Sequence, residues 1–568
     1  MTRRSALSLA ILVLALCVSC KSRSDGPSPS ADTAPATKPS PEPARAPVTV
    51  VVAYGSEKKT WLEEQAKRFE QRGEKTKGGR PIVIEAKAMG SGEVVQGIAA
   101  GQLKPHVFSP ASAVYVSLLN SAWSAKTGAT KPISPAGDPL VLSPIVVAMW
   151  KPMAEALGWP EKPIGWRDLV KVSADPKGWG AHGHPEWGRF KLGHTHPEYS
   201  NSGLLAVLAE AYAGAGKTRG LTAADLEVKA TQDHLRAIEQ TLVHYGQSTG
   251  FFADKMLARG PAYLSAAVLY ENLVIESYTK TTEAPFPVVA VYPVEGTFWS
   301  DHPYAVLDAA WVGAEEREGA QAFLRFLKEK PQQERALALG FRPADPSIPI
   351  GAPVDAAHGV DPKQPQTLLE VPDGATLEKL LAVWQDAKKT SDVILVFDKS
   401  GSMAGRPLAE AKKGARSFLD ILHDRDDVTL LFFDGALYPP IGPKQLGKDK
   451  ADLVARIDGT VADGKTALYD AVAKAHELAL ARARAEPARI HAIVVMTDGR
   501  DEHSQLPLDG LMKRFSTEEA PVKIFTIAYG EGADPTVLEQ IAEAAKGSSA
   551  RGATDTIVAV YKEMASFF

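Results

Sequence analysis

The sequence predicts an α/β protein with two large folded domains, because apolar strands alternate with amphipathic helices in two separate parts of the chain. The first part starts at Val48, and the second starts near residue 390. Of the 568 residues, 45% are hydrophobic and 23% are charged, which is an ordinary composition for a globular protein. With 64 basic and 68 acidic residues the net charge is −4, so no nucleic-acid partner is indicated.

Residues 1–20 have the features of a secretory signal. Two arginines at positions 3 and 4 precede an apolar run at residues 6–16, and the chain's two cysteines, Cys17 and Cys20, follow it. The end of this segment resembles the lipobox of bacterial lipoproteins, which implies cleavage before Cys20 and lipidation of that residue. We therefore expect a lipoprotein signal peptide, and a protein anchored to a membrane through its lipid on the periplasmic face or at the cell surface. A redox CxxC motif is disfavoured because no βαβ pattern surrounds the cysteines.

Residues 21–46 are rich in Pro, Ser and Ala and contain no aromatic residue. Such a segment cannot bury enough apolar surface to fold, so we expect a disordered tether.

The first domain, residues 48–350, begins with a βαβα pattern. Strands are predicted at residues 48–54 and 82–89, and helices at residues 59–71 and 93–102. This alternation predicts a mostly parallel sheet with helices on both faces. The apolar stretch at residues 140–150 predicts a strand that crosses into a second lobe, residues 288–307 the return crossing, and residues 318–340 a closing pair of helices.

Serine residues beside glycine or at predicted helix starts mark a candidate ligand site in this domain. Hydroxyl groups and free backbone amides at such positions can converge on an anion. Taken singly, each serine is better explained as a helix cap or turn residue, but their joint occurrence favours a binding site. The candidates are Ser56, Ser91, Ser112, Ser200 and Ser202.

The first domain resembles the extracellular solute-binding proteins of bacterial ABC importers, in the subgroup that handles small anions. The resemblance rests on Gly55-Ser56, the turn at residues 90–93, and residues 108–112, 193–203 and 292–297. It implies a periplasmic-binding-protein-like fold of two lobes that close by hinge motion on a small solute, with Thr195 at the rim of the cleft.

Four histidines, at positions 182, 184, 194 and 196, invite a zinc interpretation. We disfavour it, because these residues lie in Gly- and Pro-rich segments where histidine is usually solvated or locally hydrogen-bonded.

A candidate metal site lies in the second domain, residues 390–568. An apolar strand at residues 393–397 is followed directly by Asp398, Ser400 and Ser402, and Thr466 and Asp498 also stand beside predicted elements. All five donors are hard oxygen atoms, which suit Mg²⁺, Mn²⁺ or Ca²⁺ better than zinc.

These five residues resemble the metal-ion-dependent adhesion site (MIDAS) of von Willebrand factor A (vWA) domains. The resemblance implies a Rossmann-like fold, coordination by Asp398, Ser400, Ser402, Thr466 and Asp498, partly through water, and one position left for a carboxylate of a protein partner. The alternative is an ordinary turn in which Ser400 or Ser402 caps the next helix.

Residues 459–466 match the nucleotide P-loop pattern, but they do not follow a predicted strand. Leu453, Val454 and Ile457 recur at helical spacing in the preceding segment, so a P-loop is disfavoured.

Residues 351–389 are predicted to be a linker followed by a helix at residues 375–389. Four large apolar residues of this helix share one face, so it is expected to pack on one of the two domains. They are Leu377, Leu380, Leu381 and Trp384.

The sequence therefore predicts a lipid-anchored binding protein rather than an enzyme, acting as an adaptor, sensor or transport-associated subunit. The alternatives are the capture subunit of an ABC importer for a small anion and, less favoured, a P-loop nucleotide hydrolase.

Overall fold

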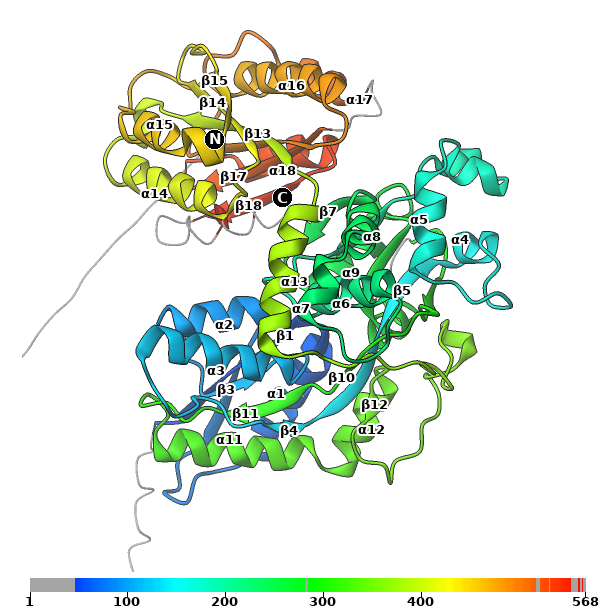
Figure 1. Cartoon of the computed structure of the whole chain (residues 1–568). Helices are drawn as coiled ribbons and strands as arrows, with labels where there is room; N and C mark the ends of the chain where they lie inside the picture. The colour runs from blue at the N-terminus through cyan, green and yellow to red at the C-terminus, as the bar shows by residue number, and fades with distance from the viewer. Residues whose placement is uncertain are drawn as a thin grey trace, which may run out of the picture. The chain divides into compact units, whose positions relative to one another are not determined.

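Figure 1 shows the computed structural model, which describes residues 46–280, 284–516, 522–530, 532–552, 560–561 and 564. The predicted signal peptide, Cys20 and all but the last residue of the predicted tether lie outside these residues. None of the described helices combines the length and apolar character that crossing a membrane requires.

The first lobe is a five-stranded sheet in the order β2-β1-β3-β11-β4. Strand β1 pairs in parallel with β2 and β3, whereas β11 runs antiparallel to β3 and β4. The strands are β1 (Val48–Gly55), β2 (Ile82–Met89), β3 (Val107–Ser109), β4 (Asp138–Pro139) and β11 (Pro303–Val306). The helices are α1 (Lys59–Arg72), α2 (Ser91–Ala99), α3 (Val114–Thr127), α11 (Ala314–Leu327) and α12 (Lys330–Ala338).

The second lobe is built around β5 (Val141–Trp150), which begins directly after the crossing from the first lobe. Its other strands are β6 (Leu192–Thr195), β7 (Leu242–Gly246), β8 (Ala266–Tyr270), β9 (Val288–Val291), β10 (Trp299–Ser300) and β12 (Arg342–Pro343). Strand β5 is antiparallel to β8, β9, β10 and β12, whereas the parallel pairing predicted from the βαβα pattern is found in the first lobe, between β1 and its neighbours β2 and β3. The reason is connectivity: β9 and β10 belong to the segment that returns to the first lobe.

The helices of the second lobe are α4 (Lys151–Ala156), α5 (Trp166–Ala174), α6 (Asn201–Ala215), α7 (Ala223–Glu227), α8 (Lys229–Glu239), α9 (Thr249–Arg259) and α10 (Glu271–Ser277). Short 3₁₀ helices are η1 (Ser56–Lys58), η2 (Gly178–His182), η3 (Pro185–Trp187), η4 (Ala356–His358) and η5 (Gly401–Met403). Helix α6 is buried along most of its length, which is consistent with its nearly continuous apolar sequence.

The predicted connecting helix is α13 (Gly374–Ala387), and it packs on α6, α7 and α8 of the second lobe. Leu377, Leu380 and Trp384 are buried, and Leu381 is partly buried. The Trp384 ring meets the His196 ring edge to face at a centroid distance of 4.9 Å. The apolar face therefore belongs to the core of the second lobe.

The C-terminal domain is a six-stranded sheet in the order β15-β14-β13-β16-β17-β18. The strands are β13 (Ser391–Asp398), β14 (Asp427–Phe433), β15 (Ile441–Gln445), β16 (Ile490–Thr497), β17 (Val522–Tyr529) and β18 (Ser548–Gly552). The helices are α14 (Arg406–Ile421), α15 (Leu446–Asp458), α16 (Leu468–Ala485), α17 (Leu508–Ser516) and α18 (Pro535–Ala544). All neighbouring strands are parallel except β14 and β15.

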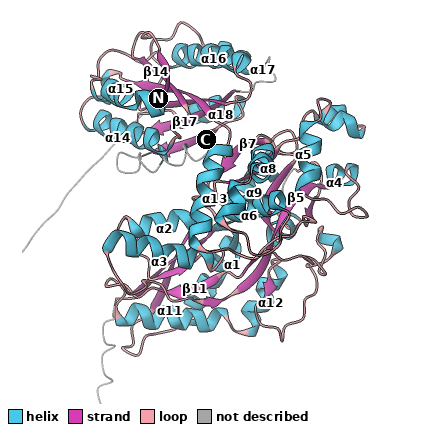
Figure 2. Cartoon of the chain, viewed as in Figure 1, coloured by secondary structure: helices cyan, strands magenta, loops and turns pink. Residues whose placement is uncertain are grey.

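Successive residues of β13 point to opposite faces of this sheet, as strand geometry requires. Val393, Leu395 and Phe397 belong to the core on one face, and Ile394 and Val396 to the core on the other. Both faces are covered by helices (Figure 2). This doubly covered, mostly parallel sheet agrees with the predicted α/β class.

Candidate functional site

The predicted metal-site residues lie where two central strands of the C-terminal sheet end. Asp398 is the last residue of β13, and Asp498 follows the last residue of the neighbouring β16. The backbone amide of Ser400 donates a hydrogen bond to Asp398 Oδ1 at 2.8 Å, and Thr497 Oγ1 donates to Asp398 Oδ2. Parallel strands thus deliver both carboxylates to the same edge of the sheet.

The hydroxyl groups of the site face the same point. Ser402 Oγ donates to Asp498 Oδ1 at 2.6 Å and lies 3.1 Å from Ser400 Oγ. A Cβ atom placed on Gly499, the residue after Asp498, would lie 3.1 Å from Thr466 Oγ1 and 3.5 Å from Ser402 Oγ, so both hydroxyls border Gly499. The structure therefore brings all five predicted residues together.

Burial raises the pKa of both carboxyl groups. It raises the pKa of Asp398 to about 6, against the hydrogen bonds from Thr497 and Ser400, and the charge of Asp498 adds to the increase. Burial also raises the pKa of Asp498. Two crowded carboxylates with three hydroxyls form an oxygen donor set with surplus negative charge, which fits Mg²⁺, Mn²⁺ or Ca²⁺.

The loop that carries Thr466 is attached to the first turn of the site through backbone hydrogen bonds. Gly401 N donates to Gly464 O at 2.9 Å, and Asp463 N donates to Lys399 O at 2.8 Å. The element before this loop is α15, as the helical spacing predicts, and not the strand that a P-loop requires. The helix-cap alternative is not observed: the N-cap of α14 is Gly405 rather than Ser400 or Ser402, and Ser400, at the N-cap of η5, makes no capping hydrogen bond with its side chain.

A second polar site lies between the two lobes of the first domain. Three helices begin there: α2 with N-cap Gly90, α6 with N-cap Ser200, and α9 with N-cap Ser248. The free backbone amides of helix amino ends favour negative charge. The fold therefore gathers three positive helix ends at one place.

The predicted hydroxyls of the second lobe form one hydrogen-bonded group with Thr249. Thr249 Oγ1 lies 2.7 Å from Ser202 Oγ and 3.1 Å from Ser200 Oγ, and Ser202 Oγ lies 2.8 Å from Thr195 Oγ1. Thr195 is fully buried, so the expectation that it lies at the rim of the cleft is wrong. It is the last residue of β6, which lies inside the sheet of the second lobe.

The predicted serines of the first lobe occupy the same region. Ser56 Oγ donates to Ser248 Oγ and accepts from Gly250 N, both at 2.9 Å. Ser112 Oγ donates to Asn201 Oδ1 at 2.6 Å across the two lobes. Ser91 Oγ accepts from Ala111 N at 3.1 Å within the first lobe.

The lobes are closed directly on each other at this place. The backbone amides of Gly92 and Glu93, at the amino end of α2, donate to the carbonyl oxygen of Tyr199 at 2.9 and 3.1 Å. Gly250 allows equally close approach, since a Cβ atom there would lie 2.5 Å from Ser56 O. These buried groups become accessible only after the lobes separate.

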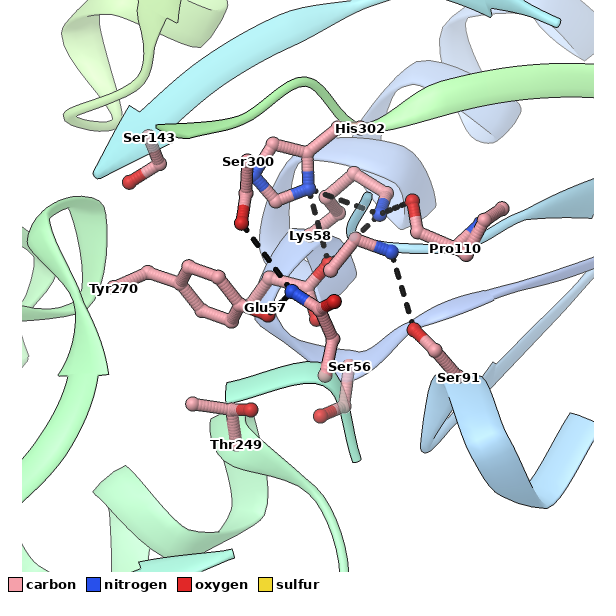
Figure 3. A network of polar contacts seen from close by, with 12 residues as sticks. Ser56, Glu57, Lys58, Ser91, Pro110, Ser143, Thr249, Tyr270, Ser300 and His302 are labelled. Atoms are coloured by element: carbon pink, nitrogen blue, oxygen red, sulfur yellow. Dashed lines mark hydrogen bonds and ion pairs between the residues drawn. The ribbon is translucent and has the colours of Figure 1, made fainter. Parts of the chain in front are cut away.

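Figure 3 shows three charged or titratable residues in the same polar network, Glu57, Lys58 and His302, which were not anticipated. Lys58 Nζ lies 2.7 Å from Glu57 Oε1, 3.2 Å from Pro110 O and 3.3 Å from His302 Nδ1. Burial alone would raise the pKa of Glu57, but Lys58 and His302 lower it to about 2. Burial lowers the pKa of His302, and the charge of Lys58 lowers it further.

Glu57 and Lys58 could have been suspected as site residues because they directly follow Ser56. The sequence did not point to them, since a charged pair after a turn is normally solvent-exposed. His302 has a φ of 41°, an unusual backbone conformation for a residue other than glycine. Asn201 and Tyr270 were also not anticipated, although Asn201 Nδ2 donates to Tyr270 OH at 2.8 Å inside the same network.

The four histidines are not gathered at one point. His184 stacks on Trp187 and lies 3.0 Å from Glu186, whereas His194 and His196 are buried in the second lobe. These two rings are not solvated but locally hydrogen-bonded, the other form expected: His194 Nδ1 lies 2.7 Å from Thr195 O, and His196 Nδ1 accepts from Glu198 N at 3.3 Å.

Comparison with known families agrees with these two parts. Residues 50–342 match the family "Bacterial extracellular solute-binding protein", and residues 392–558 match "von Willebrand factor type A domain". The chain is thus a two-lobed binding protein carrying a vWA domain. It belongs to the bacterial extracellular solute-binding protein family, and both predicted family assignments are confirmed.

Two curated relatives are themselves described as uncharacterized proteins. One, from Mycobacterium tuberculosis, is 24% identical over 502 residues, which cover 83% of this chain and 69% of that protein. Another, from Synechocystis, is 29% identical over 164 residues, which cover 29% of this chain and 38% of that protein.

Similar solved structures fall into the same two groups. A periplasmic thiamin binding protein is 12% identical, with a TM-score of 0.42, and the match covers 60% of this chain and 96% of that one. A von Willebrand factor type A structure from Catenulispora acidiphila is 20% identical, with a TM-score of 0.28; the match covers 32% of this chain and 42% of that structure.

Proposed function

We propose that this protein is a lipid-anchored, extracytoplasmic binding protein and not an enzyme. Its vWA domain binds a protein partner through a divalent cation, and its two-lobed domain captures a small solute. The observation that carries the proposal is the convergence of Asp398, Ser400, Ser402, Thr466 and Asp498 at one sheet edge.

A bound Mg²⁺, Mn²⁺ or Ca²⁺ would balance the two carboxylates and offer a coordination position to an acidic side chain of the partner. The chain's own residues hold the donors in place. Thr497 and the Ser400 amide fix the Asp398 carboxylate, and Ser402 fixes Asp498. The Gly401–Gly464 hydrogen bond keeps the Thr466 loop against the first turn.

The surface next to the site supports a protein partner. A groove runs beside Lys399 and is lined mainly by Tyr438, Pro439, Ile441 and Val461. Val461 is 73% exposed and Tyr438 is 40% exposed, and exposed apolar surface with a polar rim is typical of interaction sites. Lys399 is held at the rim by its ion pair with Asp434 at 2.5 Å.

The family match supports an extracytoplasmic location and a small-solute partner. Three helix amino ends support a solute with an anionic group. Lys58 contributes little net charge to the cleft because Glu57 pairs with it. Solute capture requires the lobes to open, since Tyr199 O occupies the amino end of α2. The alternative function is that of the capture subunit of an ABC importer, which the two-lobed fold also supports.

A peptide-binding experiment tests the proposal. The chain without residues 1–20 is immobilised, and a panel of Asp- and Glu-containing peptides is applied in Mg²⁺ or in chelator. We expect binding of acidic peptides that chelator abolishes and that Asp398→Ala lacks, whereas Asp509→Ala, an exposed position in the same domain, retains it. Equal binding by wild type and Asp398→Ala would contradict a cation-dependent role.

A further inference from the structure

A buried polar cluster in the second lobe has no role in the function proposed above. His194 lies in β6, Glu210 in the middle of α6, and Glu239 at the end of α8. All three side chains are 0% exposed. One ligand atom from each lies within 4.8 Å of the others. Three elements distant in sequence therefore bring an imidazole and two carboxyl groups to one interior point.

The hydrogen bonds around the cluster determine the state of the histidine. His194 Nδ1 lies 2.7 Å from the carbonyl oxygen of Thr195, which can only accept, so Nδ1 carries a proton. His194 Nε2 lies 3.2 Å from Glu239 Oε1. In a neutral imidazole, Nε2 then presents a lone pair to a carboxylate oxygen, and this contact is repulsive unless a cation or a second proton lies between them.

The carboxyl groups are short of donors. Tyr245 OH donates to Glu239 Oε2 at 2.6 Å, but neither oxygen of Glu210 accepts a hydrogen bond from any group in the described part of the chain. Burial raises the pKa of Glu210, and the charge of Glu239 and a side-chain hydrogen bond with it raise the pKa further. The charge of Lys389 interacts favourably with Glu239. The hydrogen bond of its ammonium group, however, goes to the carbonyl oxygen of Leu242, at 2.8 Å. A buried carboxyl group without a donor is costly, so Glu210 favours either a proton or a bound cation.

We propose that His194, Glu210 and Glu239 bind a Zn²⁺ ion inside the second lobe. Two carboxylates and one neutral imidazole balance a divalent charge, and a nitrogen ligand favours zinc over Mg²⁺ or Ca²⁺. Ligands about 2.1 Å from a tetrahedral metal lie about 3.4 Å apart, close to the 3.2 Å between His194 Nε2 and Glu239 Oε1. The Nδ1 bond to Thr195 O and the Tyr245 bond to Glu239 orient two of the ligands.

The ion would have a structural role at the solute cleft. His194 precedes Thr195, and α6, which carries Glu210, begins with the cleft residues Asn201 and Ser202. Zinc bound here would tie β6, α6 and α8 together and hold the second-lobe half of the cleft rigid. This site is separate from the vWA cation site in both position and donor chemistry.

Metal analysis of the purified protein tests this proposal. The chain without residues 1–20 is produced in medium with Zn²⁺ and purified without chelator. Its metal content is then measured by inductively coupled plasma mass spectrometry. A parallel culture with Co²⁺ in place of Zn²⁺ provides visible absorption bands as a direct probe of the ligands. We expect about one zinc ion per chain, and a cobalt spectrum typical of a nitrogen and oxygen site.

The variants separate this site from others. His194→Gln and Glu210→Gln should lose the zinc and the cobalt bands, whereas His184→Gln, at a partly exposed histidine outside the cluster, and Asp398→Ala should keep both. Wild-type protein with neither zinc nor cobalt bands would overturn the proposal whatever the variants do. Zinc retained by both folded variants would also overturn it. If the wild type contains no metal and the Glu210→Gln substitution makes the protein more stable, the carboxyl groups of the cluster share a proton instead of binding a cation.

Discussion

A Cβ atom on Gly92 would lie 2.1 Å from the carbonyl oxygen of Glu198, so only glycine permits the approach of the first lobe to the second at this point. The two residues are on opposite sides of the solute cleft. Their contact lets the amino end of α2 bind Tyr199 O in the closed conformation.

Gly92→Ala should therefore destabilise the closed conformation by about 1–3 kcal/mol, the usual effect of overpacking a tight contact. Small-angle scattering should show a larger radius of gyration than for the wild type. Gly374→Ala is the matched control, because no atom lies within 4 Å of a Cβ there. An unchanged radius of gyration for Gly92→Ala would mean that the lobes are not held closed by this contact.

Because Glu57 and Lys58 form a buried ion pair, the free energy of unfolding should decrease at acidic pH. The pKa of Glu57 is lowered to about 2 in the folded state, so its stabilisation is present above its unfolded pKa and is lost as pH falls from about 4.5 to 2. Glu57→Gln leaves Lys58 buried without its partner and should cost about 3–5 kcal/mol near pH 7.

Urea unfolding of the wild type and Glu57→Gln at pH 7 and pH 3 measures this effect. The difference between the two proteins should shrink at the lower pH. The exposed pair of Lys229 and Asp233 provides a control, since Asp233→Asn should change stability by about 0–1 kcal/mol at either pH. A constant difference for Glu57→Gln would contradict the ion pair.

Anions should stabilise the solute-binding domain through its three helix amino ends. Phosphate, sulfate and a sugar phosphate serve as probes, and saturation at 100 times the dissociation constant adds about 2.7 kcal/mol. Ser202→Ala should weaken the effect, because Ser202 connects Thr195 to Thr249. Ser124→Ala, on the exposed surface of the first lobe, should leave it unchanged. If neutral sugars stabilise the protein and anions do not, the solute is not anionic.

Cys20 should carry the lipid anchor. Cys20→Ser in the full chain should abolish incorporation of a radiolabelled fatty acid and release the protein from the membrane fraction. Cys17→Ser should leave both unchanged. Labelling of the Cys20→Ser variant would place the anchor elsewhere.

The residues of the proposed vWA cation site could be predicted from the sequence because they lie in short local segments. Asp398, Ser400 and Ser402 occupy one turn, and Asp498 follows a second apolar strand that pairs with the first. The solute-cleft serines could be proposed for the same reason, since each lies beside a glycine or a helix start.

The remaining features depend on contacts between distant parts of the chain. Lys58 and His302 are in contact although they are 244 residues apart in the sequence, and no local sequence pattern predicts this contact. The antiparallel partners of β5 follow from the order of the crossings rather than from the composition of the strand. Glu210 had one usable signal: it is the single acidic residue in a helix that is otherwise apolar or small and polar, which indicates a buried carboxyl group.

The most direct test of the central claim is the melting temperature of the chain without residues 1–20 in Mg²⁺, Mn²⁺, Ca²⁺ or chelator. The wild type and Asp509→Ala should melt at a higher temperature with at least one of these cations, because binding to the folded state alone adds stability. Asp398→Ala should show no cation-dependent rise. An equal rise in Asp398→Ala and wild type, or no rise with any cation in the wild type, would contradict a cation site at Asp398, Ser400, Ser402, Thr466 and Asp498.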